Sequence, residues 1–129
     1  VLAQNQHNDY PQNIFEIGTT FHPDKKDAYG IAEHSMCAIA ICHERADFTS
    51  IRQIIDAIGM TFGVKWSIEE ASVPSLIEGR AAKAVVNKNQ VASFGEIHPQ
   101  VLANFNISMP IAVAEINLHT LFELVKKDI

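Results

Sequence analysis

The amino-acid sequence predicts an α+β domain in which helices flank a largely antiparallel sheet. Segments with strand character outnumber helical ones, and most connections between them are too short for the crossover that parallel strands require. One hairpin is marked by turn residues between two apolar runs. The chain has 129 residues, 47% of them hydrophobic, and therefore fits one compact domain over residues 1–129.

The N-terminal part is expected to contain the end of a helix, a strand and a loop. Residues 1–3 lack an initiator methionine and read as the last turn of an amphipathic helix, so we expect a fragment truncated at its N-terminus. Pro11 ends this helix because it disfavours helical geometry at the preceding residue. Residues 14–17 predict a short strand that ends at Gly18, and residues 23–27 predict a turn or loose loop.

A buried strand and an amphipathic helix are expected next. Residues 34–42 are small, apolar and β-branched; length alone does not separate a strand from a helix here, and we favour a strand. Asp47 or Thr49 caps the helix that follows, and Gly63 ends it. Its apolar residues share one helical face: Ile51, Ile54, Ile55, Ile58 and Phe62.

The clearest β signal is a hairpin at about residues 81–97. Its strands, 81–86 and 91–97, flank turn residues at 87–90, and a short strand at 66–69 precedes them. His98 and Pro99 break the second strand.

The C-terminal part predicts a helix, a strand and a second helix. The short first helix has Val101, Leu102 and Phe105 as its apolar side. A nearly continuous apolar run at 111–116 predicts a central strand. A closing helix begins at about Leu118, and its inward-facing residues are Leu121, Leu124 and Val125.

The charge balance limits the partners that the chain can bind by itself. The formal net charge is −5, and the lysines and arginines form no cluster. Extensive phosphate contacts with nucleic acid need a basic patch, so we expect little direct binding of this kind. No apolar run has the length of a membrane span and none resembles a cleavable signal, so no membrane contact is expected.

His34, Cys37, Cys42 and His43 superficially suggest a zinc site. Structural zinc ligands come as pairs from turns, whereas these four lie within one predicted strand and point to both of its faces. We therefore expect ordinary strand packing, no metal, and two buried free thiols in a reducing cytosol.

Glu78, Arg80, Glu96 and His98 surround the hairpin and form a second candidate site. Glu96 and His98 are two residues apart on a strand and could serve a small hydrolase as an acid–base pair. If residues 88–89 form a two-residue turn, Arg80 lies on the other face and the set does not converge; a three-residue loop would alter that pairing. We favour structural hydrogen bonds and an Arg–Glu ion pair.

No motif with a known catalytic mechanism accompanies these residues. The sequence has no Gly-rich phosphate loop, no nucleophile elbow, no His-Glu-x-x-His and no Cys-x-x-Cys. The residues by themselves therefore indicate an α+β domain without a visible active site.

Four segments, in order, resemble the beta subunit of phenylalanine–tRNA ligase. Residues 10–18 look like its Tyr-Pro-Gln-x-Ile-Phe-Glu-Ile-Gly segment, and residues 74–82 look like its Pro-Ser-Phe-Ile-Glu-Gly-Arg-x-Ala segment. Residues 94–102 are similar to its Gly-Glu-Ile-His-Pro-Glu-Val-Leu segment, and residues 109–121 match its closing strand and helix. The motif residues that we expect to be structural are Glu16, Gly18, Glu78, Gly79, Arg80, Glu96, His98 and Pro99.

The resemblance implies a module folded like the catalytic domain of a class II aminoacyl-tRNA synthetase, in the archaeal or eukaryotic form of the subunit. It also implies a cytoplasmic assembly of two alpha and two beta subunits. In that assembly the alpha subunit would hold the active site, with ATP and magnesium, and tRNA would bind through the holoenzyme. The module itself is expected to be no enzyme and to hold no cofactor.

Two arginines that active class II domains use are replaced in this chain. His22 stands where the second motif grips the ATP phosphates, and Thr120 stands where the third motif begins a helix with arginine. Neither carries a permanent positive charge that could offset the negative charge of a triphosphate. We therefore expect a structural and assembly module without catalytic residues; the alternative is a free-standing amino-acid-binding or regulatory domain.

Overall fold

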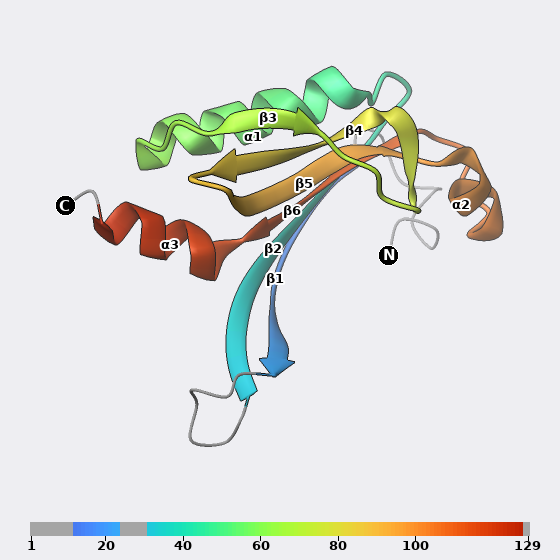
Figure 1. The fold of residues 1–129 in the computed structure, drawn as a ribbon. Coiled ribbons are helices and arrows are strands. Elements are labelled where there is room, and N and C mark those ends of the chain that lie inside the picture. The colour runs from blue at the N-terminus through green and yellow to red at the C-terminus, as the bar shows by residue number, and fades with distance from the viewer. Residues whose placement is uncertain (1–11, 24–30, 128–129) are drawn as a thin grey trace.

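The fold is a six-stranded sheet with three helices among the described residues (Figure 1). The computed structural model describes residues 12–23 and 31–127, without the side chains of 20–23, 31–34, 126 and 127. In chain order the elements are β1 (Gln12–Pro23), β2 (Ile31–Cys42), α1 (Phe48–Phe62), β3 (Ser67–Glu70), β4 (Leu76–Val86), β5 (Asn89–Ile97), α2 (Pro99–Asn104), β6 (Ile111–Asn117) and α3 (Leu118–Lys127).

All neighbouring strands of the sheet run antiparallel. Their order is β1-β2-β6-β5-β4-β3, so β6 enters between β2 and β5 although it comes last in the chain. The α+β class and the antiparallel sheet predicted from the sequence are confirmed, and so is the interior position of the strand at 111–116.

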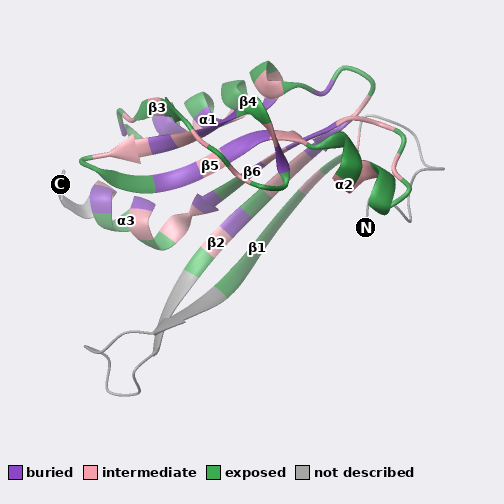
Figure 2. Cartoon of the chain, turned by 45° about the vertical axis from the view of Figure 1, so that its right-hand side comes forward, coloured by how far each residue is buried: buried purple, intermediate pink, exposed green. Residues whose placement is uncertain are grey.

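Alternation along the strands gives the sheet two unlike faces. The covered face packs against α1, which contacts β5 and β6, and against α3, which contacts β2, β5 and β6. Cys37, Phe94, Ala114 and Leu121 belong to the resulting core. The open face has no such helix layer among the described residues, and α2 lies at its end (Figure 1). Figure 2 shows the contrast between the buried central strands and the exposed β1.

The β4–β5 hairpin turns at Asn87 and Lys88, one position before the turn considered from the sequence. Both residues have positive φ, 50° and 68°, which matches the two-residue turns that suit the twist of a hairpin. A bulge after Ala84 then shifts the register by one residue. A second irregularity precedes Ala81, where Gly79 has a φ of 82°.

Most predicted strands are confirmed, but β1, β2 and β4 are longer than expected; β4, predicted at 81–86, begins at Leu76. The strand predicted at 14–17 does not end at Gly18, because β1 continues to Pro23 with every residue paired to β2. Pro23, predicted as the start of a loop, is the last residue of β1. The expected helix before Pro11 and residues 24–30 lie outside the described part of the chain.

The predicted helices are confirmed with small differences at their ends. Asp47 rather than Thr49 is the N-cap of α1, and Gly63 closes it with a left-handed φ of 67°. Phe62 is half-exposed at the last turn, where its ring lies 6.1 Å from that of Phe122. Phe105 is 62% exposed because the short α2 ends before it. None of the described helices has the length and apolarity to span a bilayer.

Gly95 leaves no room for a side chain where β5 runs beside β4. A Cβ atom there would lie 2.5 Å from the carbonyl oxygen of Arg80 and 2.9 Å from the Cα of Ala81. Because these are backbone atoms of a paired strand, Gly95→Ala should lower the free energy of unfolding by about 1–3 kcal/mol, the usual cost of overpacking.

Gly18→Ala is the matched control, because a Cβ atom at Gly18 meets nothing within 4 Å. That variant should keep or slightly raise the free energy of unfolding, since alanine loses less backbone entropy than glycine. Urea unfolding of both variants measures the difference, and equal losses would contradict the steric account.

Candidate functional site

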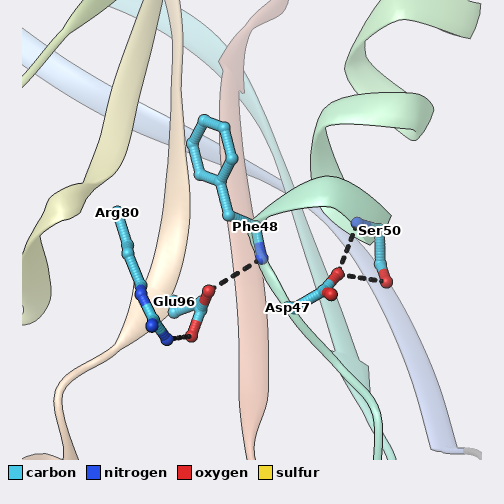
Figure 3. Close-up of polar contacts among 5 residues, drawn as sticks. All are labelled: Asp47, Phe48, Ser50, Arg80 and Glu96. Atoms are coloured by element: carbon cyan, nitrogen blue, oxygen red, sulfur yellow. Dashed lines mark hydrogen bonds and ion pairs between the residues drawn. The ribbon is translucent and has the colours of Figure 1, made fainter.

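The best-defined polar cluster joins β4, β5 and the start of α1 (Figure 3). Glu96 Oε2 accepts a hydrogen bond from the N–H of Phe48 at 3.0 Å, and Glu96 Oε1 accepts one from Arg80 Nη1 at 3.1 Å. The Glu96 side chain is 14% exposed and that of Arg80 is 62% exposed. A carboxylate at a helix N-terminus satisfies an otherwise unpaired N–H and meets the positive end of the dipole. Glu96 therefore fixes the start of α1 against β5.

An aromatic contact from the same strand holds the same helical turn. The ring of Phe94 stacks on that of Phe48 with centroids 5.4 Å apart, and Phe94 is fully buried. Next to it, Asp47 Oδ1 accepts hydrogen bonds from the N–H and the hydroxyl of Ser50, each at 2.8 Å (Figure 3). The backbone hydrogen bond, followed by the hydroxyl, holds the pKa of Asp47 below its ordinary value.

The expected Arg–Glu ion pair is confirmed. Arg80 was expected on the other face only if the turn lay at residues 88–89, and that condition is not met. With the turn one position earlier and the bulge after Ala84, the register of β4 and β5 brings Arg80 opposite Glu96. Glu78 is exposed and precedes Gly79 in the irregular stretch of β4.

His98 has a separate structural role as the N-cap of α2. The Nδ1 of His98 accepts a hydrogen bond from the backbone N–H of Gln100 at 3.1 Å. The backbone N–H of His98 donates to the carbonyl of Ser75 at 2.9 Å. Pro99 follows in the first turn, where a missing N–H costs nothing. The structure thus binds Glu96 and His98 to different partners and assembles no acid–base pair from them within the described residues.

The two cysteines are free and buried on opposite faces of β2, as the strand prediction requires. Burial raises the pKa of both the Cys37 and the Cys42 thiol. His43 Nδ1 accepts a hydrogen bond from the N–H of Arg45 at 3.0 Å, and the side chain of His34 lies outside the described residues. Across the described ranges, no three His, Cys, Asp or Glu side chains gather as a metal site would need.

The open face carries a groove along β1, β2 and β6. Three adjoining hollows of about 310, 370 and 210 Å³ share lining residues and form it. The end next to α2 is apolar except for Glu16, and both Glu16 and Glu115 line the middle and the far end. We call this surface the open-face groove; its lining includes Ile14, Glu16, Gly18, Ala38, Ala40, Ile97, Leu102, Phe105, Val113 and Glu115.

The strand register explains how the glutamates come together. One row of side chains crosses the open face from β1 to β3: Glu16, Ala38, Glu115, Ser93, Lys83 and Glu69. Because adjacent strands lie about 4.8 Å apart, Glu16 and Glu115 are separated by about 10 Å. Lys83 lies one strand from Glu69 but two from Glu115. No lysine or arginine in the described part of the chain lines the groove.

Glu115 was missed as a site residue by the sequence analysis, although a signal for it exists. It is the one charged residue of the apolar run at 111–116. A carboxylate in the middle of an interior strand must face an uncovered side of the sheet, because burying it without a partner is costly.

The two positions predicted to replace arginines lie on β1 and in the first turn of α3. His22 belongs to β1 and pairs with Ala32, and its side chain is outside the described residues. Thr120 lies in the first turn of α3, where its N–H donates to Asn117 Oδ1 at 3.0 Å. That turn follows directly on β6.

A larger hollow of about 740 Å³ lies between the end of β2 and α1, lined by Ile41, His43 and Ser50 among others. His43 and Ser50 are already bound within the 43–50 segment, His43 to the N–H of Arg45 and Ser50 to Asp47. The open-face groove, which combines an apolar lining with two glutamates, is therefore the better candidate for a binding site.

Removal of the Glu96 carboxylate should destabilise the chain more than removal of its ion-pair partner. Glu96→Ala leaves the N–H of Phe48 without its acceptor, so the free energy of unfolding should fall by about 1–3 kcal/mol. Arg80→Ala removes only a mostly exposed ion pair and should cost about 0–1 kcal/mol. Guanidinium unfolding of both variants measures this order, and the reverse order would refute the anchoring role of Glu96.

The cap at Asp47 should make part of the stability depend on pH. Because the folded pKa is lowered, the stabilisation is present at neutral pH and disappears as the pH falls through that lowered pKa. Asp47→Ala should therefore cost about 1 kcal/mol at neutral pH and progressively less in acid. Unfolding curves of both proteins across this range test the claim; a difference that persists unchanged in strong acid would contradict it.

The fold is similar to that of a solved synthetase. The crystal structure of pyrrolysyl-tRNA synthetase from Desulfitobacterium hafniense superposes with a TM-score of 0.77 and 15% sequence identity, covering 98% of this chain and 46% of that one. At this identity the likeness concerns the fold alone.

Relatives found by sequence show the family of the chain, which the likeness in fold does not. Phenylalanine–tRNA ligase beta subunits are 41% identical in Thermococcus onnurineus over 122 residues, 39% identical in Pyrococcus abyssi over 123 residues, and 33% identical in Archaeoglobus fulgidus over 123 residues. These matches cover 94–95% of this chain but only about a fifth of each relative, 21–22%. They do not favour the alternative of a free-standing regulatory domain. Residues 1–118 also match the model of the phenylalanyl tRNA synthetase beta chain CLM domain, and the chain therefore belongs to this archaeal-type family of synthetase beta chains.

Proposed function

We propose that this chain is a structural and assembly module of a phenylalanine–tRNA ligase beta subunit, with no catalytic residues of its own. Residues 1–129 form one such module, folded like the catalytic domain of a class II synthetase. In the proposed holoenzyme, the alpha subunit binds ATP and magnesium and attaches phenylalanine to tRNA. The beta module supports that subunit in an assembly of two alpha and two beta chains in the cytoplasm.

The charge of the open face carries this proposal. Transfer of an adenylyl group needs fixed positive charge around the triphosphate, usually from arginine or a metal. The open-face groove instead presents Glu16 and Glu115, and none of its described lining residues is basic. A bound triphosphate would face repulsion where it needs attraction.

The positions of His22 and Thr120 support the same conclusion. They lie on β1 and at the start of α3, where the resemblance to class II domains expects two arginines. A neutral imidazole and a hydroxyl hold no permanent charge. Thr120 also donates its N–H to Asn117, so its backbone serves the helix cap.

Four of the family-motif residues have structural contacts that suit a supporting module. Glu96 and Arg80 join the hairpin to α1, and His98 with Pro99 begins α2. Direct tRNA contact on this segment is expected to be slight, because the net charge of −5 disfavours phosphate binding.

The complete beta chain that contains this module should neither bind ATP nor activate phenylalanine. Isothermal titration with ATP should give no heat above dilution, and phenylalanine-dependent pyrophosphate exchange should stay at background. The reconstituted alpha–beta complex is the positive control and should show exchange. Robust exchange by the beta chain alone would overturn the proposal, and so would a beta chain that does not copurify with the alpha chain.

A further inference from the structure

We draw no further inference here: the strongest candidate, the groove on the open face of the sheet along β1, β2 and β6, has Glu16 in the lining of all three of its hollows, and nothing in the structure shows what covers it.

Discussion

The fold depends on how β5 holds the first turn of α1. Phe94 and Glu96 are two residues apart, so both point to the covered face; one stacks on Phe48 and the other accepts its N–H. An apolar contact and a charged hydrogen bond thus fix the same residue in position and direction. Because α1 then covers β5 and β6, this junction decides where the main core forms.

The main core lies on one face of the sheet, and the other face is only partly buried. In an antiparallel sheet one face can remain in water, and its residues are then free to serve binding. Here the open face is neither uniformly polar nor uniformly apolar, since Glu16 and Glu115 stand among small apolar residues. On the proposed non-catalytic role, these carboxylates would repel a bound triphosphate.

Local patterns made much of this structure predictable from the sequence. Capping at Asp47, the stop at Gly63 and the break at Pro99 depend on a few neighbouring residues and appear where expected. The ion pair of Arg80 was expected, but the side of the sheet on which Arg80 lies was not. The turn lies one position earlier than the one considered, and together with the bulge this moves Arg80 to the opposite face. The groove required the strand order, since its two glutamates are distant in sequence and meet only when β6 inserts beside β2.

The long β1–β2 pairing has a mechanical consequence. β2 is supported by β6 only from Met36 to Cys42, so the pairs from Thr19 to Pro23 form a ribbon that no third strand of the described residues joins (Figure 1). An isolated two-stranded ribbon is barely stable in water and twists more than a wide sheet. This arm therefore opens locally at a lower free energy than the body of the domain. Among its described pairs, those next to Met36 are held by the sheet, and those near Pro23 are the least constrained.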